Sequence, residues 1–247
     1  MIKLSVNVNK VATVRNSRGG AVPSVLEAVK VCVAAGVAGI TVHPRADARH
    51  ITLEDVREIS GYLRAQGRNA EFNIEGDPRP ELLDLVHQVK PTQCTLVPVQ
   101  PGEVTSRAGW SVNTPRDGMG RVIADLRKDR IRVSVFVDPE PAPVEWAAEV
   151  GADRVELYTE PFARAFTRGD AEGRESFGVY TRAAELAHSL RLGVNAGHDL
   201  DLENLVMFRR LPHLDEVSIG HALISHALFV GLAQSVQEYL DVLAIER

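Results

Sequence analysis

The sequence predicts an α/β fold, a closed (β/α)8 barrel, on three observations. Short β-rich segments alternate with helical segments along the whole chain of 247 residues. Eight such pairs would average about 31 residues each, which is the length of a βα repeat in a closed barrel. Most β-rich segments are nearly continuous apolar runs, as expected of parallel strands that helices cover. Because barrels of this class occupy about 250 residues, we expect residues 1–247 to form a single domain.

Eight segments have the β-rich composition of strands. In chain order they are Lys3–Val8, Gly39–His43, Ala70–Ile74, Gln93–Val97, Arg132–Val137, Arg154–Tyr158, Leu192–Asn195 and Glu216–Ile219. An open doubly wound sheet is the alternative architecture. It would usually have fewer strands and a Gly-rich dinucleotide-binding turn after the first strand, and residues 9–14 do not match that fingerprint. The closed barrel is therefore favoured.

The segments between these strands carry helix signals. Residues 24–27 (Ser-Val-Leu-Glu) and 52–55 (Thr-Leu-Glu-Asp) have the form of capping boxes, and the helices that they begin would end near Gly36 and Gly67. The remaining predicted helices are Pro80–Val89, Arg116–Arg127, Pro143–Val150, Glu175–Leu190, Leu202–Arg209 and Ala222–Leu243.

Composition and charge argue against several classes of protein. The chain has 28 Lys and Arg against 33 Asp and Glu, a formal net charge of −5, so nonspecific nucleic-acid binding, which needs a basic surface, is not expected. No apolar run approaches the roughly 20 residues of a transmembrane helix, and no signal-peptide pattern begins the chain, so we expect a cytoplasmic protein that does not associate with membranes. We expect Cys32 and Cys94 to be buried as small apolar residues, without a disulfide or a metal.

Polar residues recur at the carboxyl ends of the predicted strands, where barrels of this class carry their active sites. Six of the eight strands deliver them: Asn7 and Asn9 after the first, His43 and Arg45 after the second, Asn73 and Glu75 on the third, Glu156 on the sixth, Asn195 and His198 on the seventh, and Gly220 and His221 after the eighth. Burying so many polar groups costs free energy unless a ligand or a network satisfies them. We therefore predict a catalytic or binding site at this rim.

Two parts of the rim have features of anion sites. The loops at Gly197 and Gly220 follow the seventh and eighth strands, where backbone N–H groups and a helix N-terminus commonly bind phosphate and glycine permits close approach. A second, basic cluster in segments predicted as loops comprises Arg15, Arg18, Arg45, Arg49 and His50. Two anion sites around His and Glu side chains indicate two phosphorylated substrates joined by proton-transfer chemistry.

A metal site is not expected. The chain has no HxH or HExxH spacing, and His43, Glu75 and His198 would meet only through the fold. The other histidines fall on predicted helices or at a helix end and are predicted to be structural or surface residues: His87, His188, His213 and His226.

Two long motifs lie near the N-terminus, NVNKVATVRNSRG at residues 7–19 and GITVHPRADARHIT at residues 39–52. Shorter ones follow at residues 73–75, 96–98, 103–105, 194–198 and 219–222. Together they closely resemble the pyridoxine 5′-phosphate synthase family over nearly the whole chain. The resemblance implies a TIM barrel with extra helices that assembles as a homo-octamer. It also implies condensation of 1-deoxy-D-xylulose 5-phosphate with 3-amino-2-oxopropyl phosphate to pyridoxine 5′-phosphate, with release of inorganic phosphate and water and without a metal or organic cofactor.

The resemblance also implies roles for individual residues, carried over motif by motif. His43 is similar to a general acid/base of the first steps, and Glu75 to a second proton acceptor. His198 is similar to a proton donor, and Glu156 to a residue that stabilises a cationic transition state. The positions that bind 3-amino-2-oxopropyl phosphate correspond to Asn7, Arg18, Asp199, Gly220 and His221. Those that bind the deoxyxylulose phosphate correspond to Asn9, Lys10, Arg45, His50 and Thr105.

Three positions depart from the family pattern. This chain has Asn9 and Lys10 where an Asp-His pair is common, so a positive charge for an anion is kept but Asn9 cannot act as a base. Asp199 stands in place of a common glycine, and its carboxylate would weaken a nearby phosphate site unless it turns away. Val99 stands where a Glu is common.

Two other functions remain open from the sequence. A Schiff-base aldolase would use Lys10, although a catalytic lysine is normally desolvated and Lys10 lies among loop arginines. A phosphate-ligand-binding barrel without catalysis is suggested by Asn9 and Asp199. Against it, the chain retains all four candidate catalytic residues, His43, Glu75, His198 and Glu156.

Overall fold

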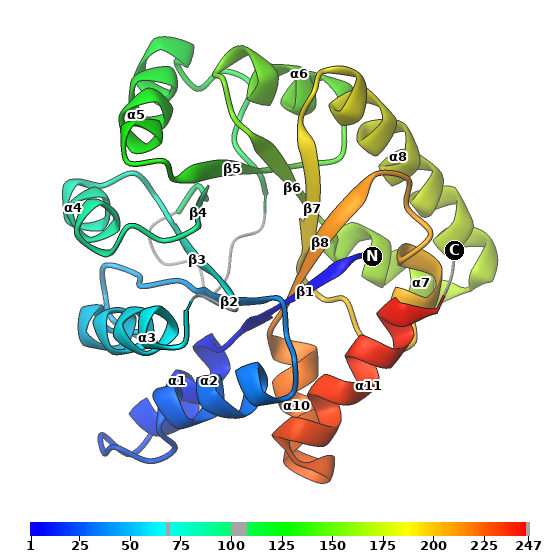
Figure 1. Cartoon of the computed structure of the whole chain (residues 1–247). Helices are drawn as coiled ribbons and strands as arrows, with labels where there is room; N and C mark the ends of the chain where they lie inside the picture. Colours follow the sequence, from blue (N-terminus) through cyan, green and yellow to red (C-terminus); the bar gives the residue numbers. More distant parts are fainter. Residues whose placement is uncertain (68–69, 100–107, 246–247) are drawn as a thin grey trace.

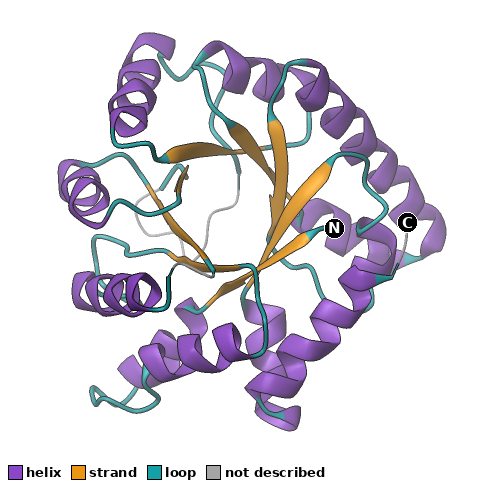
Figure 2. Cartoon of the chain, in the orientation of Figure 1, coloured by secondary structure: helices purple, strands orange, loops and turns teal. Residues whose placement is uncertain are grey.

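The structure, a computed structural model, describes residues 1–67, 70–99 and 108–245. Eight parallel strands follow one another in sequence order around a closed barrel, and β1 pairs with β8 to complete it. The helices surround the strands on the outside (Figures 1 and 2). The predicted closed α/β barrel with extra helices is confirmed.

Each strand lies within two residues of its predicted bounds. The strands are β1 Lys3–Asn7, β2 Gly39–Val42, β3 Glu71–Gly76, β4 Gln93–Leu96, β5 Arg132–Val137, β6 Arg154–Tyr158, β7 Gly193–Gly197 and β8 Leu214–Ile219. The largest differences are at β3, β7 and β8. β7 continues through Ala196 and Gly197 because both residues pair with β6 and β8, which composition alone does not show.

Eleven helices lie in the described part of the chain. They are α1 Asn9–Asn16, α2 Val25–Ala34, α3 Leu53–Ala65, α4 Pro80–Val89, α5 Arg116–Lys128, α6 Pro141–Glu149, α7 Glu160–Arg168, α8 Asp170–Ser189, α9 Leu205–Phe208, α10 His221–Val230 and α11 Leu232–Ala244. α1 occupies a segment predicted as a loop, and α7 is absent from the prediction. The predicted helix Ala222–Leu243 is two helices, because Gly231 has a φ of +87° that breaks the helical backbone between them.

The predicted caps begin α2 and α3. The Thr52 hydroxyl accepts the backbone N–H of Asp55 at 3.2 Å, and the Asp55 carboxylate accepts the N–H of Thr52 at 2.8 Å. This reciprocal pair satisfies two N–H groups that a helix start otherwise leaves without partners. At α2 the Ser24 hydroxyl accepts the N–H of Glu27 at 3.2 Å. Both helix starts therefore follow from the local sequence.

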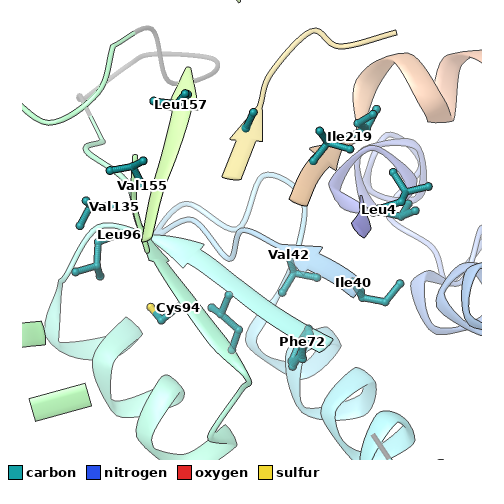
Figure 3. Packing of buried hydrophobic residues seen from close by; sticks show 14 of the residues in the cluster. Leu4, Ile40, Val42, Phe72, Cys94, Leu96, Val135, Val155, Leu157 and Ile219 are labelled. Carbon is teal, nitrogen blue, oxygen red and sulfur yellow. The ribbon is translucent and has the colours of Figure 1, made fainter. Parts of the chain in front are cut away.

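An apolar layer between the strands and the helices forms the core. Alternate strand residues point outward into it, among them Leu4, Ile40, Phe72 and Leu157 (Figure 3). Cys94 belongs to this layer, and it and Cys32 are free and buried, as predicted. No helix of the described chain is both long and apolar enough to cross a membrane. The outward residues hold the barrel together and leave the inward residues to line its axis.

The barrel interior is polar, unlike the outer layer. Ser5 and Thr41 share a hydrogen bond of 2.7 Å, Asn73 donates to Thr41 at 3.3 Å, and Thr95 donates to Asn73 at 3.0 Å. All four side chains are buried. Barrels of this class usually fill their interior with branched apolar side chains. Here a hydrogen-bonded polar network fills the interior. The rim residues lie on the same strands, directly above this network.

Candidate active site

A cavity of about 320 Å³ opens at the carboxyl ends of the strands, where the sequence predicts the site. All residues to which the family resemblance assigns a role, except Arg18 and Thr105, line it. Arg18 follows α1 and is exposed outside the cavity, and Thr105 lies outside the described residues. The lining residues are Asn7, Asn9, Lys10, His43, Arg45, His50, Glu75, Val97, Phe136, Glu156, His198, Asp199, Ser218, Gly220 and His221.

Two buried carboxyl groups, Glu75 on β3 and Glu156 on β6, lie in the cavity wall. Burial raises the pKa of Glu75 well above its usual value, and the negative charges of Glu156 and Glu216 raise it further. Burial and then the charge of Glu216 raise the pKa of Glu156 to about 8. A carboxyl group with such a pKa holds a proton near neutral pH and can donate or accept one during a reaction.

His43 lies beside Glu75 at the end of β2. Its Nδ1 is 3.9 Å from Glu75 Oε2, and its backbone N–H donates to Asn9 Oδ1 at 2.9 Å. Its Nε2 is buried and has no hydrogen-bond partner among the described residues. Burial, followed by the positive charges of His50 and Arg45, lowers the pKa of His43 to about 3. The imidazole is therefore neutral near pH 7.

Asn7 and Asn9 link β1 to this pair. Asn7 donates from Nδ2 to Glu75 Oε2 at 3.4 Å, and its Oδ1 accepts the backbone N–H of Asn9 at 3.0 Å. Asn9 in turn accepts from the backbone of His43. Asn9 thus orients the His43 backbone, a role that an amide oxygen fills without acting as a base.

His198 and Asp199 follow β7 with strained backbones. Their φ angles are +94° and +57°, in a region that side chains with a Cβ rarely adopt. Thr159 holds this turn, since its hydroxyl contacts the carbonyl oxygens of Gly197, at 2.8 Å, and His198. The His198 ring packs edge-on against Tyr158, with ring centroids 5.2 Å apart. Strain of this kind persists where surrounding contacts enforce it, often at active sites.

The Asp199 carboxylate turns toward His198. Its Oδ2 lies 3.3 Å from His198 Nδ1, and this hydrogen bond is the main reason that the pKa of Asp199 falls below its usual value. The charges of His221 and Lys10 lower the pKa of Asp199 as well. Asp199 is therefore an ionised partner of a candidate proton donor.

Gly197 and Gly220 are needed for packing inside the site. A Cβ on Gly197 would lie 2.5 Å from Glu156 Oε1, and one on Gly220 would lie 3.1 Å from the Asn7 carbonyl oxygen. The sequence predicts that these glycines let a ligand approach the backbone, and the structure adds that they make room for Glu156 and Asn7. α10 begins directly after Gly220, as the predicted anion site requires.

The basic side of the cavity has fewer members than predicted. Lys10, at the start of α1, lines the cavity together with the buried Arg45 and with His50. Arg15 instead forms an ion pair with Asp55, and Arg49 forms one with Asp47. The prediction that Arg15 and Arg49 belong to an anion site stays a prediction. Neither residue lines the cavity, and each contacts a carboxylate, Arg15 that of Asp55 and Arg49 that of Asp47.

His50 is held in one orientation. Its Nδ1 accepts the backbone N–H of Ile51 at 3.0 Å, which leaves Nε2 to carry the proton of the neutral ring. Burial, followed by the charges of Arg45 and Lys10, lowers the pKa of His50 to about 4. His50 is thus a neutral hydrogen-bond donor beside the cations Arg45 and Lys10.

Asn73 and Asn195 are not in the cavity wall, although the sequence places them at the rim. Both lie two residues before a rim position and belong to the interior network. Three lining residues, Val97, Phe136 and Ser218, are absent from the prediction. Ser218 lies on β8 two residues before the rim residue Gly220, and this period-two spacing is the signal that would have found it. Among the described residues, no group of three or more His, Cys, Asp or Glu is placed to hold a metal ion.

The candidate structural histidines lie away from the cavity. His87 contacts Asp125 and Asp129 on the surface. His188 and His213 stack with ring centroids 3.7 Å apart, and His226 contacts Glu238. None of the four lines the cavity.

Comparison with known proteins places the chain in a family. The family model described as "Pyridoxal phosphate biosynthesis protein PdxJ" matches residues 4–245. A curated protein named pyridoxine 5′-phosphate synthase from Christiangramia forsetii is 52% identical over 244 residues, covering 98% of this chain and 100% of the relative. Another of the same name, from Porphyromonas gingivalis, is 48% identical over 246 residues, covering 99% and 100%.

Solved structures of low sequence identity share the fold. Phosphoribosyl anthranilate isomerase from Thermotoga maritima matches with a TM-score of 0.63 at 14% identity, covering 98% of both chains. Thiamine phosphate pyrophosphorylase from Pyrococcus furiosus matches with a TM-score of 0.61 at 14% identity, covering 98% of this chain and 95% of the other. These likenesses concern the barrel alone, whereas the family match and the curated relatives concern function. The chain belongs to the PdxJ family of pyridoxal phosphate biosynthesis proteins and is an enzyme of the pyridoxine 5′-phosphate synthase type.

Proposed function

We propose that the cavity condenses 1-deoxy-D-xylulose 5-phosphate with 3-amino-2-oxopropyl phosphate to pyridoxine 5′-phosphate, one inorganic phosphate and two molecules of water. The observation that carries this proposal is that one cavity, in a chain of the PdxJ family, brings together three buried ionisable side chains: His43 Nδ1 lies 3.9 Å from Glu75 Oε2, and Glu156 lies in the same wall. The pKa of His43 is lowered to about 3, and that of Glu156 is raised to about 8. A neutral base and a neutral acid are then available together near pH 7, as ring closure by repeated proton transfer requires.

The candidate catalytic residues act in different steps of this proposal. His43 accepts and returns protons at the start, through an Nε2 that has no partner in the described chain. Glu75, with Oε2 3.9 Å from His43 Nδ1, is the second proton acceptor, after it has released the proton that its raised pKa retains. His198 donates a proton, with Asp199 holding its ring. The proposed reaction uses no metal ion or organic cofactor.

Glu156 is proposed to stabilise a cationic intermediate. Its carboxyl group is buried in the cavity wall. A positive charge that develops in the cavity favours the ionised form of a nearby carboxyl group and lowers its pKa. The carboxylate of Glu156 would then form at the step that needs it, and the raised pKa would restore the proton afterwards.

The two phosphate groups are proposed to occupy different parts of the rim. Asn7, Asp199, Gly220 and His221 would bind 3-amino-2-oxopropyl phosphate, with the N–H groups at the start of α10 as the main donors. The deoxyxylulose phosphate would be bound by Asn9, Lys10, Arg45 and His50. The assignments of Arg18 and Thr105 as further ligands stay predictions.

Turnover of the purified protein with both phosphates tests the proposal. We expect one pyridoxine 5′-phosphate and one inorganic phosphate per cycle, measured by chromatography with mass spectrometry and by a phosphate assay. Omission of either substrate should abolish both products. Release of phosphate without a pyridine product would overturn the proposed condensation. Borohydride treatment with the deoxyxylulose phosphate serves as a control, because trapping on Lys10 would indicate the aldolase chemistry instead.

Self-association and location are also proposed. The end of α10 exposes Leu228 and Phe229, with 75% and 88% of their surfaces accessible, beside Val230. Large apolar side chains grouped in this way commonly mark a protein interface. We expect a second copy of the chain to cover these side chains in the homo-octamer that the resemblance implies. Each copy would consist of one barrel domain. Light scattering of the parent and of Phe229→Asp tests this, since a smaller assembly is expected for the variant.

The proposed location is the cytoplasm. Cys32 and Cys94 are free thiols, as is usual for cysteines in that reducing compartment.

A further inference from the structure

A third buried carboxyl group, Glu216, lies inside the barrel and outside the cavity wall. It is 3% exposed and stands on β8, two residues before the cavity residue Ser218. Neither the sequence patterns nor the proposed reaction uses it. A buried carboxyl group costs free energy unless partners stabilise it, so its position close to two candidate catalytic carboxyls calls for a physical reason.

Glu216 and Glu156 flank the same amide. Glu156, Asn195 and Glu216 are register partners on β6, β7 and β8, so their side chains share the inner face of the barrel. Neighbouring strands are about 4.8 Å apart, which places the two glutamate backbones roughly 10 Å from each other. Asn195 Nδ2 donates to Glu216 Oε1 at 3.4 Å. Between groups this deeply buried, charge interactions are screened much less than in water.

The charges around Glu216 come from four other strands. Lys3 on β1 and Arg132 on β5 both form ion pairs with Glu71 on β3. Arg154 on β6 donates to Asn195 Oδ1 at 2.7 Å and lies 3.9 Å from Asp215 Oδ2. These cations lie close enough to act on Glu216 but already have other partners.

The pKa of Glu216 lies close to neutral pH. Burial raises its pKa to about 7, and the cations Arg154, Arg132 and Lys3 oppose that rise while Glu71 adds to it. On the other side, the charge of Glu216 is among the causes that raise the pKa of both Glu75 and Glu156. The charge of Glu216 therefore opposes ionisation of Glu156 and Glu75.

We propose that Glu216 is a positioning residue for the reaction: from beneath the cavity, its side chain acts on Glu156 across Asn195, which lies between them on the inner face of the barrel. It touches no substrate. The inference rests on the proposed function for its role in catalysis, but its electrostatic part concerns the ligand-free protein. Removal of the charge should favour ionisation of Glu156, so that Glu156 loses its proton at lower pH.

The test is Glu216→Gln, which removes the charge and keeps an oxygen to accept from Asn195. Infrared titration of the ligand-free protein follows the protonated carboxyl band, assigned to Glu156 by its loss in Glu156→Gln. We expect the midpoint to fall by about 0.5–1 pH unit. The acidic limb of the kcat profile should move in the same direction. An unchanged midpoint would overturn the inference.

Two further variants separate charge from structure. Asp215→Asn removes the neighbouring carboxylate, which is partly exposed and lies near the same Arg154, and it should leave the midpoint in place. Glu216→Asp keeps the charge, so its midpoint should stay closer to the parent than that of Glu216→Gln. Equal shifts in all three variants would show a structural disturbance and overturn the inference. Should the glutamine variant fail to fold, Glu216→Met removes the same charge and must give the same downward shift.

The outcome is distinguishable from that of the proposed function. A lower midpoint in the ligand-free Glu216→Gln protein supports the inference even if the two phosphates yield no pyridine product. Absence of product in the parent, with the expected shift in the variant, counts against the proposed condensation alone.

Discussion

Two glutamates on one strand have different surroundings at the two ends of the barrel. Glu71 and Glu75 both lie on β3 and both point inward, four residues apart. Glu71, at the amino end, accepts hydrogen bonds from Lys3 and Arg132. Glu75, at the carboxyl end, has a 3.4 Å hydrogen bond from Asn7 and the 3.9 Å approach of His43.

The pKa values of the two glutamates move in opposite directions. Burial alone would raise the pKa of Glu71, but its hydrogen bonds to Lys3 and Arg132 outweigh this and lower it. At Glu75 burial acts with other carboxylates, and the pKa rises. The same residue type on the same strand is therefore fixed as an anion at one end and kept able to exchange a proton at the other. Four predictions test this division.

The largest effect is expected for Glu75→Gln. The amide keeps the shape of the side chain but cannot accept a proton, so ring formation should fall by about 10²–10⁴-fold. Substrate affinity should change little, because the proposed phosphate contacts come from other residues. Steady-state turnover measured beside calorimetric binding separates the two. Unchanged turnover with weaker binding would make Glu75 a ligand contact.

The next largest effect is expected for Gly197→Ala at the carboxyl end of β7, compared with Gly193→Ala at its amino end. Gly197→Ala would place a Cβ 2.5 Å from Glu156 Oε1 and 3.3 Å from the Ser218 carbonyl oxygen. Displacement of Glu156 should lower kcat by about 10²-fold, the scale of a misplacement near 1 Å. Gly193→Ala, the matched control, would meet Asp215 and Arg154 side chains that can move. A similar loss of activity in both variants would show that position along the strand does not matter.

The fold was predictable from sequence because barrel strands and caps are local features. Apolar runs mark the strands, and Thr52 with Asp55 marks the start of α3. The sequence did not show how deep Asn73 and Asn195 lie inside the barrel. Two residues along a strand, roughly 6.6 Å, separate the interior network from the cavity. Such a shift leaves the side chain on the same face of the strand, so the alternation pattern does not distinguish the two positions.

Side-chain partners distant in sequence were the other limit. Arg15 is predicted to face an anion, yet its partner Asp55 lies 40 residues away and on another helix. Glu216 carries no motif, and its importance comes from register with Asn195 and Glu156 on neighbouring strands. The rim residues were found because strand ends meet in every barrel of this class.

A smaller effect is expected for Lys10→Met at the carboxyl end. Lys10 lines the cavity, whereas Arg49 is paired with Asp47 on the surface. Loss of the Lys10 charge should raise the KM for the deoxyxylulose phosphate by about tenfold and change the KM for the amino ketone phosphate much less, as expected when a binding contact to one substrate is removed. Arg49→Met should leave both KM values near those of the parent. Equal effects of Lys10→Met on both substrates would contradict its assignment.

The smallest effect on activity is expected for Glu71→Gln at the amino end, where the cost should appear in stability instead. Its partners Lys3 and Arg132 would lose their ionised acceptor, and the free energy of unfolding at pH 7 should fall by about 1–2 kcal/mol, discounted for partial exposure. Because the pKa of Glu71 is lowered in the folded protein, the parent gains this stability above the usual value of 4.5 and loses it as pH falls through the folded pKa. Urea unfolding of both proteins at pH 7 and at pH 3 checks this, and the difference between them should shrink at the lower pH. A difference that stays constant would mean that the Glu71 charge is not what stabilises this end of the barrel.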